Sequence, residues 1–178
     1  AGFKVRRIIN EPTAAALAYG LDKKKDEQVV VYDFGGGTFD VSVLEIIGGS
    51  EEQSIQVKST DGDSHMGGED IDQKIIKWIG DEFKKQNGLD ITKDELALQR
   101  LKEAAEKAKH ELSTMNQTEI NIPFISSDAS GPVHLNMSMT KATLEDLARE
   151  FIDRSIEITK CAMDASGFKI SDIDEIIM

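Results

Sequence analysis

Two aspartates and a run of three glycines mark the segment of this chain best suited to chemistry. Residues 29–45 read VVVYDFGGGTFDVSVLE, so Gly35–Gly37 lie between two apolar stretches and are flanked by Asp33 and Asp40. Because glycine has no Cβ and tolerates positive φ, consecutive backbone N–H groups can turn toward an oxyanion such as phosphate. Thr38 adds a hydroxyl, and the two carboxylates can hold a hydrated Mg²⁺ ion. The segment therefore predicts half of a nucleotide site.

The glycine run is not a Walker A element. No Gly-Lys-Ser/Thr follows it, and the next residues alternate as in a strand. We therefore expect the phosphate to lie against a β-hairpin. The alternative is a glycine-rich hairpin turn with solvated aspartates, and the residue types alone favour neither interpretation.

The composition indicates a globular protein that avoids nucleic acid and membranes. With 178 residues, 39% hydrophobic and 30% charged, the chain can bury one core or two small ones. Its net charge of −12 repels nucleic acid and anionic lipid, and the basic run Lys23–Lys25 has acidic neighbours. There is no signal peptide and no apolar run near the length of a membrane span.

The cysteine and histidines predict neither a disulfide nor a zinc site. Cys161 is the only cysteine, and its expected helical, apolar surroundings predict a small buried side chain. His65, His110 and His134 show no metal-ligand spacing with it. Together these features favour a reducing compartment, either the cytosol or an organelle matrix.

The first part of the chain is predicted to be rich in strands. Residues 5–9 read as a strand, and a short helix follows over 11–19, with proline in its first turn and Gly20 after its end. The hairpin around the glycines, a turn over 48–52 and an alternating strand over 54–59 complete a β-meander.

Helical periodicity then replaces strand alternation. Apolar residues recur at helical spacing over 71–83, until Asn87–Gly88 ends the helix. A second helix follows, beginning with a capping box of Thr92 and Glu95 and ending near Ser113.

The last part combines a hairpin, a long helix and a final strand. Strands are expected over 118–125 and 134–139, on either side of a polar turn. Thr140 can cap a long helix that Gly167 closes, and a last strand begins near Ile173.

This order suggests one α/β layer interrupted by an insertion. We expect residues 1–67 and 141–178 to form a core subdomain and residues 68–140 an inserted one, with Gly67–Gly68 as the hinge. The chain opens on Ala1 and closes on an apolar run, from which we expect a fragment of a longer protein.

Four motifs resemble the DnaK-type heat-shock chaperones of the seventy-kilodalton class. They are IINEPTAAALAYG at 8–20, YDFGGGTFD at 32–40, GGED at 67–70 and RLKEAAEKAK at 100–109. The resemblance runs over essentially the whole chain. It implies an α/β fold, the actin-like ATPase (ribonuclease H-like) domain, of which this chain resembles most of the second lobe with an inserted α+β subdomain.

The resemblance also implies roles at the phosphate end of the site. The residues that would contact the β- and γ-phosphates are Gly35, Gly36, Gly37 and Thr38. Asp33 and Asp40 would help to position magnesium, through water, and the attacking water, and Glu11 would lie on the γ-phosphate side. The reaction would be transfer of the γ-phosphoryl group of ATP to water, catalysed by positioning and charge stabilisation.

A second constellation would hold the adenosine. Glu106, Lys109 and Ser113 share one helical face, and by resemblance the first two bind ribose hydroxyls and the third reaches the adenine edge. His110 is a further candidate against the adenine, and Gly67 and Gly68 would also lie near the nucleotide. Without the resemblance, Glu106 and Lys109 would read as a surface ion pair worth about 0.3 kcal/mol.

The family's first phosphate loop, catalytic lysine and peptide-binding domain have no match here, so we expect the chain alone not to hydrolyse ATP. By resemblance, unfolded polypeptides bind that absent domain, and a GrpE-type exchange factor binds the outer subdomain. A J-domain cochaperone would dock near Arg7, Asn10 and Thr13, for which exposed polarity and helix capping are the alternative. Another actin-like ATPase, a sugar or acetate kinase or a filament-forming protein, is the alternative function.

Overall fold

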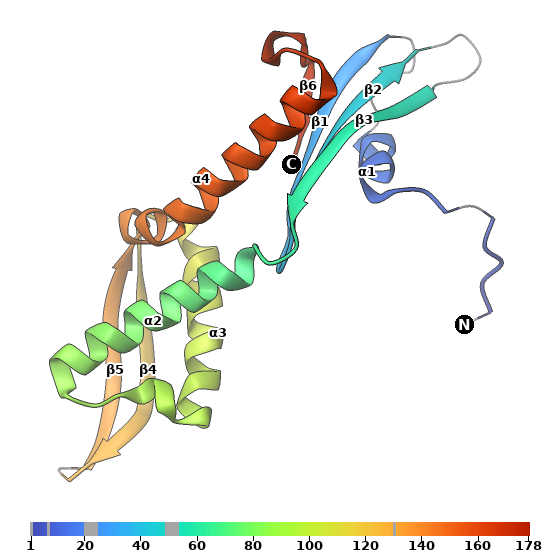
Figure 1. The fold of residues 1–178 in the computed structure, drawn as a ribbon. Coiled ribbons are helices and arrows are strands. Elements are labelled where there is room, and N and C mark those ends of the chain that lie inside the picture. The colour runs from blue at the N-terminus through green and yellow to red at the C-terminus, as the bar shows by residue number, and fades with distance from the viewer. Residues whose placement is uncertain (1, 7, 20–24, 49–53, 130) are drawn as a thin grey trace. The chain divides into compact units, whose positions relative to one another are not determined.

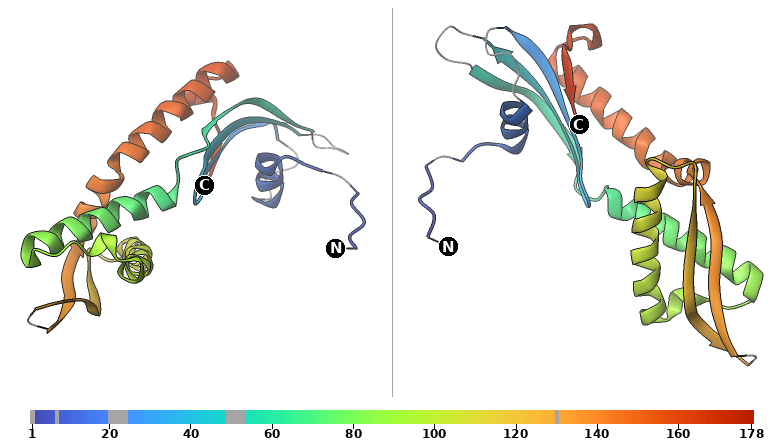
Figure 2. Two further views of the ribbon diagram at one scale, coloured as in Figure 1. Left: turned by 60° about the horizontal axis from the view of Figure 1, so that its bottom comes forward. Right: turned by 180° about the vertical axis from the view of Figure 1, so that it is seen from behind.

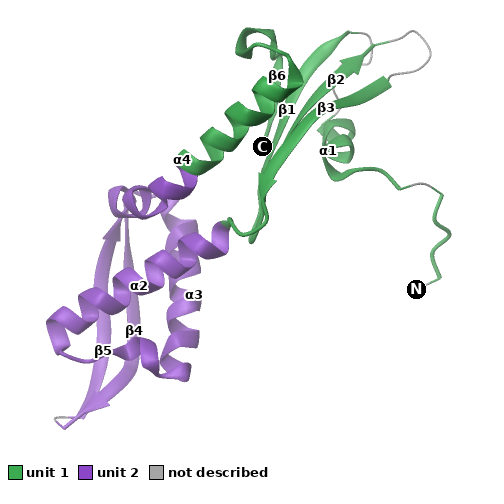
Figure 3. Ribbon diagram, viewed as in Figure 1, with its two compact units in different colours: residues 1–67, 153–178 green, residues 68–152 purple. Residues whose placement is uncertain are grey.

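The residues described by the computed structural model are 2–6, 8–19, 25–48, 54–129 and 131–178. They form two compact units (Figure 3). Unit 1 comprises Ala1–Gly67 and Asp153–Met178, and unit 2 comprises Gly68–Ile152. Each unit has its own hydrophobic core and is described by itself below.

Unit 1 is built on a mixed β-sheet whose described strands follow the order β3-β2-β1-β6 (Figure 1). Its elements are α1 (Glu11–Tyr19), β1 (Glu27–Phe34), β2 (Phe39–Ile47), β3 (Ser54–Asp63), the C-terminal part of α4 (Lys141–Ser166), the 3₁₀-helix η2 (Ile170–Asp172) and β6 (Glu175–Ile177). Neighbouring strands of the meander are antiparallel, whereas β6 runs parallel to β1. The predicted short helix, meander and final strand are confirmed.

Helices cover both faces of this sheet (Figure 2). On one face, Val31 and its apolar neighbours pack with Ala16 of α1. On the other, the Tyr32 hydroxyl donates a 2.6 Å hydrogen bond to Ser155 Oγ, and Ser59 Oγ donates to the carbonyl of Ala162 at 2.7 Å, both on α4. The period of two along β1 therefore sends successive side chains to different helices.

The predicted strand over residues 5–9 is wrong for the residues that the structure describes. Residues 2–6 and 8–10 have no regular structure, and the Val5 and Ile8 side chains are 73% and 87% exposed. A strand is stable only beside a neighbour that completes its hydrogen bonds, and none of the described strands pairs with this segment. Gly20 and most of the turn expected over 48–52 lie outside the described residues.

Unit 2 packs two helices against a hairpin. Its elements are α2 (Gly68–Asn87), the 3₁₀-helix η1 (Ile91–Lys93), α3 (Glu95–Leu112), β4 (Gln117–Asp128), β5 (Gly131–Thr140) and the N-terminal part of α4. Apolar side chains from α2, α3, β4 and β5 form its core. The predicted helices and strands are confirmed, although β4 extends through Asp128, into the expected turn.

The predicted capping box of Thr92 and Glu95 is wrong. Asp94 is the N-cap of α3, and its Oδ1 accepts a hydrogen bond from the backbone N of Ala97 at 2.8 Å. Thr92 instead lies inside η1, where its hydroxyl donates to Asp90 Oδ1 at 2.6 Å. The carboxylate nearer to the helix start satisfies a free N–H group that the threonine does not reach.

Helix α4 contributes to both units. Thr140 Oγ1 accepts from the backbone N of Thr143 at 3.2 Å, and Gly167 follows the helix with φ of +80°, as predicted. Leu144 and Leu147 pack against the unit 2 core, so the chain passes from unit 2 to unit 1 after Ile152, whereas the sequence predicts this boundary at residue 140, before the helix.

The prediction of a buried Cys161 is wrong. The thiol is exposed, because the buried stripe of α4 runs through Ser155, Ile158 and Ala162 and Cys161 lies outside it. None of the described helices is both long and apolar enough to cross a membrane.

Candidate functional site

The glycine run forms the turn of the β1–β2 hairpin. Phe34 pairs with Phe39, and the backbone N of Gly35 donates a 2.9 Å hydrogen bond to the carbonyl of Thr38. We call residues 35–38 the glycine turn. Gly36, Gly37 and Thr38 are exposed, so the glycine turn is open to a ligand.

Asp33 and Asp40 lie directly opposite each other at the base of this turn. Cross-strand partners have Cβ atoms about 5 Å apart and project from the same face of the sheet. Like charges in that arrangement are destabilising. The pair therefore has a cost in the free protein that a bound cation would relieve.

A cavity of about 340 Å³ opens on this face of the sheet. Its lining residues come from the start of α1 and from β1, β2 and β3: Asn10, Glu11, Pro12, Ala15, Val31, Asp33, Asp40, Ser42, Val57 and Thr60. We call it the carboxylate cavity, because Glu11 joins Asp33 and Asp40 there. These are predicted site residues from three separate elements.

The donor set fits magnesium shared with a phosphate. Among the described residues, no group of three or more His, Cys, Asp or Glu side chains is arranged to hold a metal ion by itself. Mg²⁺ does not require such a cage, since it usually binds one or two carboxylates together with phosphate oxygens and water. The opposed Asp33 and Asp40 supply hard oxygen ligands of that kind.

Two hydroxyls of the carboxylate cavity were missed from the sequence. Ser42 Oγ and Thr60 Oγ1 are 3.1 Å apart, and Thr60 Oγ1 also contacts the Val41 carbonyl at 3.3 Å. The period of two along a strand could have indicated Ser42, because Ser42 follows Asp40 by two residues and therefore lies on the same face of the sheet.

In unit 2, Lys109 of α3 is held at the start of α2. Its Nζ donates to the carbonyl of Gly68 at 3.0 Å and to Asp72 Oδ2 at 2.7 Å. The Lys109 and Asp72 side chains are only 23% and 16% exposed. The ion pair that Lys109 makes is therefore with Asp72 and not with Glu106, and Asp72 is a further residue missed from the sequence.

The other predicted adenosine residues lie at the C-terminal end of α3. Glu106 Oε1 is 4.0 Å from His110 Nε2, and both side chains are well exposed. Ser113 is the C-cap of α3, and its Oγ donates to the His110 carbonyl at 2.6 Å. The structure thus brings Gly68 and Lys109 together and leaves Glu106 and His110 facing solvent.

The predicted J-domain residues have ordinary structural roles where they are described. The Asn10 carbonyl accepts from Ala14 N at 3.0 Å at the start of α1, and Asn10 also lines the carboxylate cavity. Thr13 is half-buried in α1, and Arg7 lies outside the described residues.

A mixed sheet with a β-meander, helices on both faces and an inserted α+β unit is the architecture of a lobe of an actin-like ATPase, with a glycine hairpin at its phosphate end. The model of the Hsp70 protein family matches residues 1–178, and the chain belongs to the Hsp70 family. Members of this family are chaperone ATPases that bind ATP or ADP with magnesium and engage unfolded polypeptides and cochaperones. The match favours a chaperone over a kinase or a filament-forming protein.

Proposed function

We propose that this chain supplies the phosphate- and adenosine-binding surfaces of one lobe of a DnaK-type chaperone ATPase. The observation that carries the proposal is the carboxylate cavity, where Asp33 and Asp40 face each other across the glycine turn and Glu11 joins them from α1. Two opposed carboxylates of this kind are suited to a cation that binds together with phosphates.

The glycine turn would bind the β- and γ-phosphates through backbone N–H groups and the Thr38 hydroxyl. Asp33 and Asp40 would hold hydrated magnesium, which when bound neutralises charge on the phosphate oxygens. Asp40 and Glu11 would orient a water for in-line attack, so catalysis would rest on positioning more than on proton transfer. Ser42 and Thr60 add hydrogen-bonding groups to the same cavity.

In unit 2, Lys109 would recognise the ribose. An ammonium group has three N–H donors, and the contacts described for Lys109 use two of them, to Gly68 and Asp72. The third can donate to a ribose hydroxyl, beside the exposed Glu106 carboxylate as an acceptor. Ser113 and His110 would contact the adenine, and Gly67 and Gly68 would lie near the nucleotide.

The wider proposal follows the family. The chain alone would not turn over ATP, and coupling to unfolded polypeptides would run through a separate peptide-binding domain. A GrpE-type exchange factor would bind unit 2, and a J-domain would dock near Arg7, Asn10 and Thr13, in a bacterial cytoplasm or the mitochondrial matrix.

The test is a titration of the chain with Mg-ADP to millimolar concentration, followed by amide chemical shifts. We expect shifts at residues 35–38 and at 106–113, with the first set weakened in Asp33→Asn. Glu45→Gln is the matched control, because Glu45 pairs with Lys58 at 3.2 Å and does not line the cavity. A folded protein without shifts, or shifts at 35–38 unchanged in Asp33→Asn, would contradict the proposal.

A further inference from the structure

The segment that leaves β3 passes directly against the glycine turn. A Cβ placed on Gly67 would lie 2.4 Å from the carbonyl oxygen of Gly36 and 2.6 Å from the backbone N of Gly37. Both separations are far below van der Waals contact, and the atoms met are backbone, which cannot rotate away. Gly67 is also buried. Its bare Cα therefore forms the surface on which the Gly36–Gly37 peptide rests.

A second glycine, Gly62 near the end of β3, lies against Asp40. Gly62 pairs with Asp40 in the β2–β3 register. A Cβ on Gly62 would lie 2.5 Å from the Phe39 carbonyl oxygen and 3.0 Å from Asp40 Oδ1. The Phe39 carbonyl, which belongs to the backbone, and the Asp40 carboxylate thus both occupy space that a side chain at residue 62 would take.

Lack of space for a Cβ atom, and not an unusual backbone conformation, is the reason that glycine is required at residues 62 and 67. Neither has φ in the left-handed region, in contrast to Gly88 and Gly167, whose φ values are +71° and +80°. An alanine could adopt the backbone conformation at either position. The added methyl group of alanine would, however, displace the glycine turn or Asp40 from its present position.

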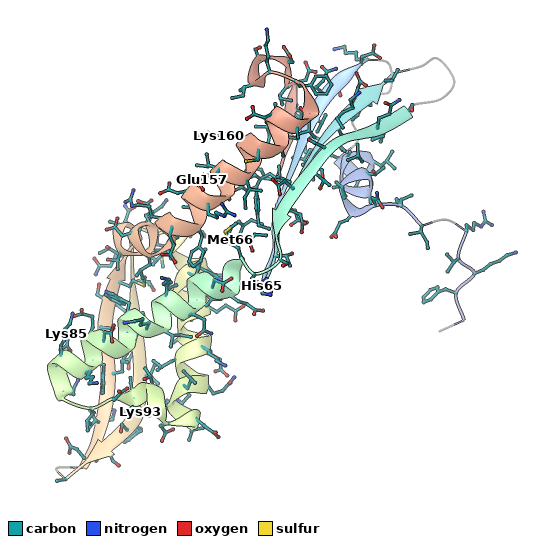
Figure 4. All side chains as sticks on the ribbon, viewed as in Figure 1. His65, Met66, Lys85, Lys93, Glu157 and Lys160 are labelled. Atoms are coloured by element: carbon teal, nitrogen blue, oxygen red, sulfur yellow. The ribbon has the colours of Figure 1, made fainter. Side chains whose placement is uncertain are left out.

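Local contacts hold the intervening residues in place. Asp63 Oδ1 accepts from the backbone N of His65 at 2.9 Å, and Ser64 Oγ contacts His65 Nδ1 at 2.9 Å. The Met66 side chain is buried, at 3% exposure. Figure 4 shows His65 and Met66 in the connection between β3 and α2. Residues 63–66 are therefore tied to one another by local contacts, and Met66 is anchored by its burial.

We propose that Gly62 and Gly67 are positioning residues for the phosphate site. Gly67 sets the position of the Gly36–Gly37 peptide, whose N–H group belongs to the proposed phosphate site, and Gly62 sets the position of the Asp40 carboxylate. The consequence for phosphate binding rests on the proposed function, whereas the steric claim concerns the free protein alone.

The steric claim is tested without nucleotide in Gly67→Ala and Gly62→Ala. We expect Gly67→Ala to move the amide signals of Gly36 and Gly37. It should also speed hydrogen exchange of the Gly35 amide, which is hydrogen-bonded to the Thr38 carbonyl, about tenfold or more. Gly62→Ala should move the signals of Phe39 and Asp40. In the unaltered protein, nuclear Overhauser contacts should join Gly67 Hα to the Gly37 amide, a measurement that requires no variant to fold.

Gly80→Ala is the matched control, because its added Cβ would lie 2.5 Å from Thr92 Cγ2 in unit 2. It should lower stability without moving signals of residues 35–40. Equal movement of those signals in Gly80→Ala, or an unmoved glycine turn in Gly67→Ala, would overturn the proposal, as would absence of the Gly67 contacts in the unaltered protein.

A titration with Mg-ADP then tests the consequence for the ligand. The Gly67→Ala and Gly62→Ala proteins should bind Mg-ADP at least about tenfold more weakly than the Gly80→Ala protein does. The reason is that the first substitution displaces N–H donors of the glycine turn and the second displaces the Asp40 carboxylate. Equal affinity would overturn the positioning role. No binding by the unaltered protein would refute the proposed function instead, and the measurements without nucleotide would still decide the steric claim.

Discussion

Lys109 and Asp72 join α3 to the first turns of α2 through a 2.7 Å ion pair that is largely shielded from solvent. Breaking a shielded pair leaves one charge without its partner, which costs more than losing an exposed pair. We expect Asp72→Asn to lower the free energy of unfolding by about 1–2 kcal/mol. Urea denaturation of the chain measures this directly.

The matched control is Asp81→Asn, which breaks the 2.5 Å pair of Lys77 with Asp81 on the outer face of α2. Those side chains are 73% and 54% exposed, so the loss should stay below about 0.5 kcal/mol. Equal losses in the two variants would show that shielding does not strengthen the Lys109 pair.

Gly80 and Thr92 form a tight contact between α2 and η1. Glycine to alanine inside a helix usually stabilises a protein by about 1 kcal/mol. Here the new methyl would lie 2.5 Å from Thr92 Cγ2. The Thr92 side chain cannot change rotamer freely, because its hydroxyl is hydrogen-bonded to Asp90. We expect Gly80→Ala to destabilise the protein by about 1 kcal/mol instead.

Thr92→Ser provides the decisive comparison, since it removes Cγ2 and keeps the hydroxyl. In a double-mutant cycle, the Gly80→Ala change should become neutral or stabilising in the Thr92→Ser background, with a coupling of about 1–2 kcal/mol. Additive effects of the two substitutions would contradict the contact.

Asp90 makes unit 2 sensitive to acid. The hydrogen bond from the Thr92 hydroxyl, with help from Lys84 at 3.3 Å, lowers the pKa of Asp90 from 3.8 to about 2. A carboxyl whose pKa is lower in the folded state adds stability above the unfolded pKa, and that stability is lost as pH falls through the folded pKa. The affected range is therefore about pH 4 to pH 2.

Unfolding of Asp90→Asn, measured across that range, should show a shallower loss of stability than the unaltered protein. The difference between the two curves isolates Asp90 from the other carboxyls. Parallel curves would mean that Asp90 is not held ionised by its neighbours in the folded state.

Elements with strong local signals could be predicted from the sequence. Helices α2 and α3 follow apolar periodicity, and the hairpin follows from glycines between two apolar strands, which also places Asp33 opposite Asp40. The strand expected over 5–9 also contains apolar residues, but a strand depends on a neighbour that the local sequence does not reveal. The prediction that Cys161 is buried was wrong for a related reason, because the elements that pack against α4 decide which of its side chains are buried.

The parts of the site that escaped prediction are contacts between distant segments. Asp72 meets Lys109 only because α2 and α3 pack together, and nothing in the spacing of either residue indicates it. The sequence indicated Gly67 only as a hinge glycine near the nucleotide and gave no role to Gly62, whereas in the structure both positions lack space for a Cβ atom. Such roles require coordinates, since they depend on which backbone lies opposite.

Phe124 interrupts β4 with an unusual backbone. Its φ is +53°, in the left-handed region that bulky residues avoid, and the β4–β5 register shifts between Ile122 and Ser126. Arg100 Nη1 and Nη2 donate to the carbonyls of Phe124 and Pro123 at 3.0 and 2.7 Å. His134 Nδ1 accepts from Phe124 N at 3.0 Å. Side chains from two other elements thus hold the strained residue.

This arrangement predicts that glycine at residue 124 gives a more stable protein than alanine, the reverse of the usual order in a strand. In an ordinary strand, glycine is less stable than alanine by about 0.5–1 kcal/mol. At φ of +53° the alanine Cβ is strained by about 1–2 kcal/mol and glycine is not. Because Phe124 is 66% exposed, both substitutions remove little buried surface. We expect Phe124→Gly to be more stable than Phe124→Ala by about 1 kcal/mol in urea denaturation. The opposite order would show that this part of β4 adopts an ordinary extended backbone in solution.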